Sequence, residues 1–330
     1  MGWKHPGITV AVSLAALAGA AGIFVAFATP KSRPAAAIRV EITPERVERG
    51  RYLFHSVADC AGCHSPRDAS KFAMPADPAR TGAGFVFPKE LGFPGSIVGP
   101  NITPDPETGV GRWTDGEKIR AIREGISRDG RALFSLMPYR QFAKMSDEDI
   151  YSLVAYMNSL PPVKNPLPRT SLQFPVSVLN RFEPAPMLTP PQPPSPRDAV
   201  RYGEFLAGLA CIQCHSELSK GKPVQGREFA GGHEFAVGQF IVRSANLTPD
   251  HETGIGSWTE ERFVRRFRDY GGLTYASAPR AVQANFTLMP WFGFSRMKEE
   301  DLRAIYAYLR TLRPVYNPVV LHPQLATQAN

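Results

Sequence analysis

Apolar residues near the end of each half of the chain recur with helical spacing. One set is Ile150, Leu153, Val154, Met157 and Leu160, and the other is Leu302, Ile305, Tyr306, Leu309 and Leu312. Spacings of three and four residues place each set on one face of a helix. Strictly alternating apolar and polar runs, the usual signal for strands, do not stand out anywhere in the sequence. The pattern therefore predicts an all-α fold in which short helices are joined by long loops.

Local start and stop signals place two earlier helices in the first half. One is predicted from about Pro44 to just before Cys60, because proline is tolerated in the first turn, where its missing N–H has no partner. The next begins at Thr114, where Glu117 three residues later predicts a capping box, and ends at Gly125.

A methionine precedes the last helix of each half. The helix is predicted to begin after Ser146 in the first half and near Lys298 in the second. Met145 and Ile150 have the spacing of a hydrophobic staple, in which two apolar side chains pack across the helix start. Met297 holds the corresponding place, so both methionines are predicted to belong to the core.

The N-terminus carries an uncharged stretch from Ile8 to Ala28, with Lys4 before it and Lys31 after it. About 20 apolar residues are needed to cross a bilayer, whereas the apolar part of a signal peptide has about 7 to 15. We therefore expect residues 1–33 to hold a retained transmembrane helix. Cleavage after Ala28 is the alternative, and either outcome places the rest of the chain outside the cytoplasm.

The chain is a tandem duplication. The segment NITPDPETGVGRWT at 101–114 returns as NLTPDHETGIGSWT at 246–259, and LMP at 136–138 returns at 288–290. Each copy also ends in an Asn-Pro pair, at 165–166 and 317–318. The repeat predicts two homologous domains, residues 34–165 and 197–330.

The segment between the copies is rich in proline, since residues 161–196 hold 12 of the 32 prolines. Proline fixes φ and removes a hydrogen-bond donor, which disfavours both helix and central strand. We predict that residues 166–196 form an extended, semi-rigid connector. A proline-rich recognition peptide is the alternative.

Composition is that of a globular protein, with 43% hydrophobic and 21% charged residues. The net charge is +8, which by itself would permit a nucleic-acid or acidic partner. The first repeat unit carries as many acidic as basic side chains, so most of the excess lies elsewhere. We therefore predict no nucleic-acid partner.

The cysteines point to a cofactor. All four lie in two Cys-x-x-Cys-His motifs, which comprise Cys60, Cys63 and His64 in the first copy and Cys211, Cys214 and His215 in the second. This is the pattern for haem c attachment: two thioethers fix the edge of the macrocycle, and the following histidine reaches the iron. A zinc ribbon would need the cysteine pairs closer together, and a thioredoxin-like pair would need a βαβ setting. We predict two covalently bound haem c groups, with the two histidines as proximal iron ligands.

A distal iron ligand should recur at a similar distance after each histidine. Met137 lies 73 residues after His64, and Met289 lies 74 residues after His215. Each methionine precedes a proline, which favours an extended loop conformation. Histidine and methionine together raise the reduction potential of haem iron. No other catalytic motif was found, so the chain is predicted not to be an enzyme by itself.

Several segments resemble the cytochrome c subunits of bacterial membrane-bound dehydrogenases, which serve quinoprotein alcohol and flavin-dependent sugar-acid dehydrogenases. The segments are NITPDPETGVGRWT, LMPY, SDED, SLPPV and LQFPVSVLNR, and the resemblance covers roughly residues 44–320. It implies two tandem class I cytochrome c-like domains with the haem-binding residues named above. Those subunits typically have three haem domains, whereas this chain has two attachment motifs.

These observations predict a membrane-tethered dihaem cytochrome c with its haem domains in the periplasm, or a soluble periplasmic form if the N-terminus is cleaved. Its expected role is to carry single electrons from a dehydrogenase or quinol-linked donor to a terminal oxidase or soluble cytochrome. A dihaem cytochrome c peroxidase is the alternative. That enzyme needs an open iron face, which the matching Met137 and Met289 argue against.

Overall fold

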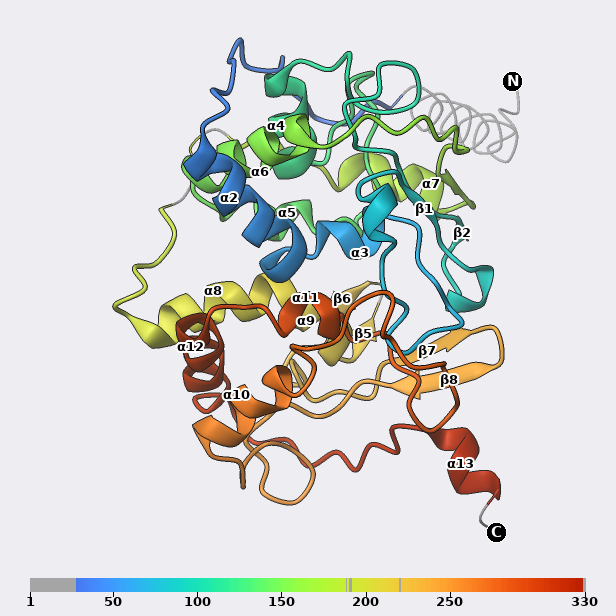
Figure 1. Ribbon diagram of the computed structural model, residues 1–330, viewed down its shortest axis with the longest axis vertical. Coiled ribbons are helices and arrows are strands. Elements are labelled where there is room, and N and C mark those ends of the chain that lie inside the picture. The colour runs from blue at the N-terminus through green and yellow to red at the C-terminus, as the bar shows by residue number, and fades with distance from the viewer. Residues whose placement is uncertain (1–27, 188, 190–191, 220, 329–330) are drawn as a thin grey trace, which may run out of the picture.

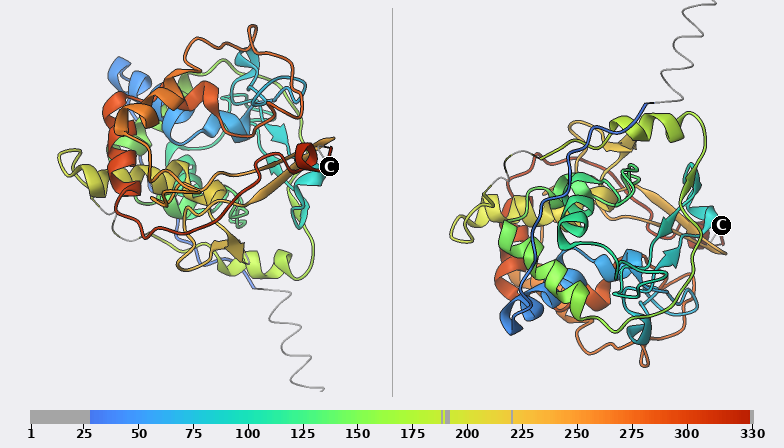
Figure 2. Two further views of the ribbon diagram at one scale, coloured as in Figure 1. Left: turned by 90° about the horizontal axis from the view of Figure 1, so that it is seen from below. Right: turned by 90° about the horizontal axis from the view of Figure 1, so that it is seen from above.

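The computed structural model describes residues 28–187, 189, 192–219 and 221–328. Within them each repeat forms a set of short helices joined by long loops. The first repeat, blue to green in Figure 1, lies above the second, yellow to red. In the two views of Figure 2, from below and from above, one repeat lies in front of the other.

The first repeat and the segment after it contain the elements up to residue 182. The helices are α2 (Pro44–Tyr52), the π-helix η1 (Leu53–Val57), α3 (Cys60–His64), α4 (Asp115–Glu124), α5 (Tyr139–Phe142), α6 (Asp147–Ser159) and α7 (Val176–Leu179). Short 3-10 turns are η2 (Pro78–Arg80), η3 (Lys89–Leu91) and η4 (Asn180–Phe182). Strands β1 (Phe85–Val86) and β3 (Val98–Gly99) pair antiparallel, as do β2 (Gly95–Ser96) and β4 (Ser171–Leu172).

The second repeat follows the same order of helices. These are α8 (Ala199–Ala210), α9 (Ile212–His215), α10 (Glu260–Arg268), α11 (Trp291–Phe294), α12 (Glu299–Leu309) and α13 (Pro323–Gln328). Two hairpins are formed by β5 (Leu218–Ser219) with β6 (Lys222–Pro223) and by β7 (Glu234–Val237) with β8 (Phe240–Arg243).

The predicted helix starts are confirmed. The Thr114 hydroxyl accepts a hydrogen bond from the Glu117 N–H while the Glu117 carboxylate accepts one from the Thr114 N–H, and α4 ends at Gly125, whose φ is +68°. Helix α6 follows Ser146, which caps it. Met145 and Met297 are 0% and 1% exposed, so both belong to the core as predicted.

Glycine sets the crossing of the first and last helices in both repeats. A Cβ placed on Gly50 of α2 would lie 2.0 Å from the carbonyl oxygen of Ser152 in α6. A Cβ placed on Gly203 of α8 would lie 1.8 Å from the carbonyl oxygen of Ala304 in α12. Each helix pair can therefore approach this closely only because a side chain is missing.

The predicted all-α fold class is wrong, because β7 and β8 form a regular antiparallel hairpin. Gly238 has φ of +56°, a conformation that glycine supplies to a two-residue hairpin turn. Val237 and Val242 are buried with Met74 and Phe286 in a small second core. This packing against another repeat, not a clear alternation in the sequence, stabilises the strands.

The predicted transmembrane helix is likewise not supported by the structure. The uncharged stretch lies, except for Ala28, outside the described residues. Among the described residues, no helix is both long enough and apolar enough to cross a membrane. The predicted domain boundaries stay predictions.

One hydrophobic core joins the two repeats, since a single cluster of buried residues contains α2 and α6 as well as α8 and α12 side chains. At the contact, Phe72 stacks on Tyr270 with ring centroids 5.4 Å apart. Tyr52 donates a hydrogen bond to Asp301 and accepts one from the Lys298 N–H at 3.0 Å. Hydrogen bonds and aromatic stacking therefore hold the two repeats together across their interface.

Candidate functional site

The first attachment motif is the short helix α3, which is held by close backbone packing. It starts after Asp59, whose φ of +45° turns the chain between η1 and α3. A Cβ on Gly99 of β3 would lie 1.9 Å from the carbonyl oxygen of Cys63. The strand therefore fixes the position of the motif from one side.

A backbone carbonyl orients the histidine of each motif in the same way. His64 Nδ1 lies 2.8 Å from the Pro100 carbonyl oxygen, and His215 Nδ1 lies 2.8 Å from that of Ala245. Since a carbonyl only accepts, Nδ1 carries the proton and Nε2 is left with a lone pair. Burial lowers the pKa of both imidazoles and favours this neutral form. Such a histidine is suited to bind a metal through Nε2.

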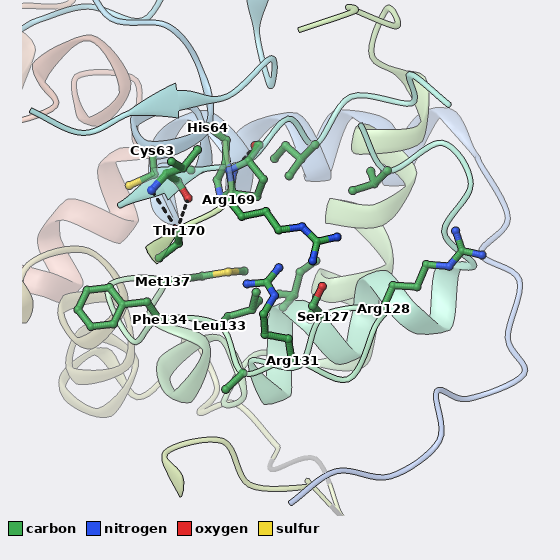
Figure 3. A pocket seen from close by; sticks show the side chains of 18 of the residues that line it. Cys63, His64, Ser127, Arg128, Arg131, Leu133, Phe134, Met137, Arg169 and Thr170 are labelled. Atoms are coloured by element: carbon green, nitrogen blue, oxygen red, sulfur yellow. Dashed lines mark hydrogen bonds between the residues drawn. The ribbon is translucent and has the colours of Figure 1, made fainter. Parts of the chain in front are cut away.

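The structure brings the predicted site residues of the first repeat together. Cys60, Cys63, His64 and Met137 all line one cavity of about 1200 Å³. In Figure 3 the Met137 side chain extends across the cavity below His64, with Cys63 at one edge. Nitrogen and sulfur donors thus face one space from two sides.

The second repeat reproduces the local geometry. The Trp291 N–H donates to the Met289 carbonyl at 2.8 Å, as the Tyr139 N–H donates to that of Met137 at 2.8 Å. The exposure of the cysteines differs, since Cys211 is buried and Cys214 exposed whereas Cys60 and Cys63 are both partly buried. The matching backbone bonds and the shared orientation of the two histidines make the second motif a local copy of the first.

The residues present fit a covalently held haem. The cavity is large and mostly apolar in its lining, with Val110, Phe142 and Leu153 among its walls. Burial raises the pKa of the Cys63 thiol to about 12, and the nearby Asp59 carboxylate adds to the shift. A thiol held protonated is a poor thiolate ligand, which argues against direct binding of a metal ion by this cysteine. Within the described part of the chain, no group of three or more His, Cys, Asp or Glu side chains could hold a metal ion.

The two attachment motifs are close to each other. The Cys63 and Cys214 thiols lie near enough to interact electrostatically, and Arg67 is close to both. Burial raises the pKa of Asp59 to about 7, while Arg67 opposes the shift. The cysteines of the two attachment motifs therefore lie near each other at the interface between the repeats.

The repeated asparagines are structural residues whose role the sequence did not show. The Asn101 side-chain amide donates to Thr108 Oγ1 at 3.0 Å and to the Val163 carbonyl at 2.7 Å. Asn246 makes the equivalent bonds in the second repeat. These bonds tie the loop beside the histidine to the end of each repeat. The recurrence of Asn, Thr and Asp at the same places in both copies of the motif was the signal that could have found them.

Two arginines at the cavity were also missed. Arg169 Nη1 lies 3.3 Å from Asp129 Oδ2, and Arg131 Nε lies 3.8 Å from the same oxygen. Arg169 comes from the predicted connector and Arg131 from the loop after α4. No local sequence pattern links these residues, so only the tertiary structure brings them to the haem cavity.

Comparison with known proteins agrees with this geometry. The family model for cytochrome c matches residues 47–161 and 200–313. The cytochrome c subunit of alcohol dehydrogenase (quinone) from Gluconobacter oxydans (strain 621H) is 29% identical over 82% of this chain and 55% of its own length. The gluconate 2-dehydrogenase cytochrome c subunit of Pantoea cypripedii is 29% identical over 81% of this chain and 59% of its own length. The chain thus spans little more than half the length of these subunits.

A further relative matches along nearly its whole length. The diheme cytochrome c-type protein of Cereibacter sphaeroides is 28% identical over 92% of this chain and 97% of its own length. Two matched repeats, each with an attachment motif, imply two covalently bound haem c groups. The chain belongs to the cytochrome c family.

Proposed function

We propose that this dihaem cytochrome receives single electrons from a dehydrogenase and passes them to a terminal oxidase or a soluble cytochrome. The names of the relatives support a dehydrogenase donor, since several are cytochrome subunits of alcohol, gluconate or fructose dehydrogenases. The comparisons give no support to a dihaem peroxidase.

The proposed ligand set follows the geometry of the first cavity. Cys60 and Cys63 would hold the haem of the first repeat through thioethers, and His64 and Met137 would bind its iron. Cys211, Cys214, His215 and Met289 would do the same in the second repeat. The observation that carries the proposal is that His64 and Met137 approach one cavity of about 1200 Å³ from opposite sides.

Each side chain has a distinct task at this site. The Pro100 carbonyl holds the Nδ1 proton of His64, so Nε2 stays directed at the cavity. The Met137 thioether closes the opposite side, and apolar walls such as Leu153 limit access of water. Bound haem c supplies a one-electron Fe(III)/Fe(II) couple, whose ferrous state a thioether ligand favours. A site closed on both faces suits electron transfer rather than peroxide chemistry.

The proposed location is the bacterial periplasm. Covalent haem c attachment takes place outside the cytoplasm, and the uncharged N-terminal stretch is typical of exported chains. Fusing a reporter enzyme that is active only in the periplasm to the C-terminus tests this. An inactive reporter on a stable fusion would contradict the location.

The axial ligands are tested by replacing the two loop methionines singly. Met137→Ala and Met289→Ala should each abolish about half of the sulfur-to-iron charge-transfer signal in absorbance and magnetic circular dichroism. Met145→Leu and Met297→Leu are matched controls, because these methionines are buried in the core. They should leave the spectra unchanged. Retention of the full signal in either alanine variant would overturn the ligand assignment.

A further inference from the structure

The haem cavity of the first repeat ends in a pair of cationic side chains. In Figure 3 the guanidinium groups of Arg131 and Arg169 point into the cavity, on the side away from Cys63. Both lie near Asp129, at 3.8 and 3.3 Å respectively. Two cations that share one carboxylate leave a net positive charge at this end of the cavity.

The matching positions of the second repeat are not charged. The repeats can be aligned on their Asn-Pro pairs, because Asn165 donates to the Ala83 carbonyl at 2.7 Å and Asn317 donates to that of Ala230 at 2.9 Å. The alignment sets Arg169 opposite Leu321, and residues 318–321 are all uncharged.

The loop that carries Arg131 also differs between the repeats. Its counterpart after α10, residues 270–288, contains a single basic residue, Arg280. The backbone of Arg280 forms a bridge with Lys71 of the first repeat, which places this arginine at the interface between the repeats. The arginine pair is thus a feature of the first repeat only.

The propionate groups of haem c are the anions that this arginine pair would bind. The two thioether bonds lie on one edge of the porphyrin, and the two propionates project from the opposite edge. Cys63 lies at one side of the cavity and the arginines at the other (Figure 3). Arginine binds carboxylates in a planar, bidentate geometry.

We propose that Arg131 and Arg169 bind the propionates of the haem in the first repeat and make it the higher-potential site, so that electrons pass from the second repeat to the first. This inference rests on the haem sites proposed above. A nearby positive charge stabilises Fe(II) relative to the more positive Fe(III). Because the Arg131 and Arg169 side chains are 42% and 78% exposed, solvent and salt screen part of this effect. Burial acts in the same direction, since His64 is 8% exposed and His215 is more exposed.

The resulting transfer is balanced without any other reactant. One electron leaves Fe(II) in the second repeat and enters Fe(III) in the first, and no bond forms or breaks. The two attachment motifs lie close enough for the Cys63 and Cys214 thiols to interact electrostatically, so the transfer is expected on this side of the haems.

The test is a potentiometric titration of the holoprotein, followed by absorbance. In the unmodified protein the haem of the first repeat should be reduced first. Met137→His and Met289→His assign the two potentials, because each should lower the potential of its own haem. Arg169→Leu, which copies Leu321, should shift only the higher potential downward, and Arg131→Leu should do the same. The reciprocal Leu321→Arg should shift the lower potential upward.

Arg128→Leu is the matched control. Arg128 lies in the same loop and lines the same cavity, but its guanidinium lies farther from Met137 than that of Arg131 (Figure 3), and its charge is paired with Glu117 at 3.5 Å. This variant should leave both potentials unchanged. Haem content and the low-spin spectrum report on the ligand sites separately. If both are intact and Arg169→Leu leaves the higher potential unmoved, or if the second repeat is reduced first, the inference is wrong while the ligand assignment stands.

Discussion

At the scale of single residues, His55 shows how the interior of this protein controls ionisation. Its Nε2 lies 2.8 Å from the Tyr156 hydroxyl, and its carbonyl oxygen lies against Gly293 of the second repeat. Burial, with help from Arg296 and Arg51, lowers the pKa of the imidazole from 6.5 to about 4. A proton is therefore bound more tightly in the unfolded chain than in the folded one.

The pH dependence of stability follows from this sign. The contribution of His55 to folding is fully present above pH 6.5 and is lost as the pH falls toward about 4. His55→Gln should flatten the decline of the unfolding free energy across this window, measured by urea titration of the holoprotein. The exposed His251 provides the control, since His251→Gln should keep the original slope. Equal slopes in all three proteins would contradict the role of His55.

At the scale of elements, the crossings of α2 with α6 and of α8 with α12 decide how each repeat packs. Both crossings depend on a glycine in the first helix, Gly50 or Gly203. A missing side chain allows a helix backbone to contact a carbonyl oxygen directly, which no other residue type permits without a shift.

Helix α8 offers a matched pair of glycines for testing this. Gly203→Ala should destabilise the holoprotein by about 1–3 kcal/mol, because overpacking forces the backbones apart. At Gly208 of the same helix the nearest atom to an added Cβ is the Gln141 side-chain oxygen at 3.5 Å. Gly208→Ala should be neutral or stabilise by up to about 1 kcal/mol, as alanine favours helix. Urea unfolding measures both, and a smaller loss at Gly203 than at Gly208 would contradict the packing account.

At the scale of the whole molecule, the two repeats behave as one body. They share a hydrophobic core, and the Tyr52 hydroxyl bonds to Asp301 and to the Lys298 N–H. Burial and the Asp301 carboxylate raise the pKa of Tyr52, which keeps the phenol protonated as a donor. The interface thus contains a directional contact as well as apolar packing.

Removing this contact should weaken the whole protein and not one repeat alone. Tyr52→Phe should cost about 1–3 kcal/mol, because the buried Asp301 loses a donor. Tyr316→Phe, at a tyrosine that is 63% exposed, should stay within about 0.5 kcal/mol of the original protein. Unfolding followed by haem absorbance and by tryptophan fluorescence should give one midpoint in each protein. Two separate midpoints in the unmodified protein would show that the repeats unfold independently.

The sequence predictions were most accurate where the interacting residues lie close together in the chain. The start of α4 at Thr114 and its end at Gly125 were predictable, because capping involves residues within one turn. Pairing Met137 with His64 required the second repeat as an internal comparison, and the two side chains do line one cavity. The hairpin of β7 and β8 was missed because its strands are four residues long and are stabilised by packing with Met74 of the other repeat.

The sequence by itself determined the duplication, the two haem attachment motifs and the starts of α2, α4, α6 and α12, because each depends on residues close together in the chain or on recurrence. The tertiary structure alone decided which distant residues meet. Arg169, 40 residues from Asp129, reaches the first haem cavity only because the segment after Asn165 folds back along β3. The hydrogen bond from Tyr52 to Asp301 forms only when the two repeats pack together. Such contacts form because burying shared apolar surface outweighs the entropy lost in closing long loops. Local sequence patterns do not show which distant segments will bury that surface together.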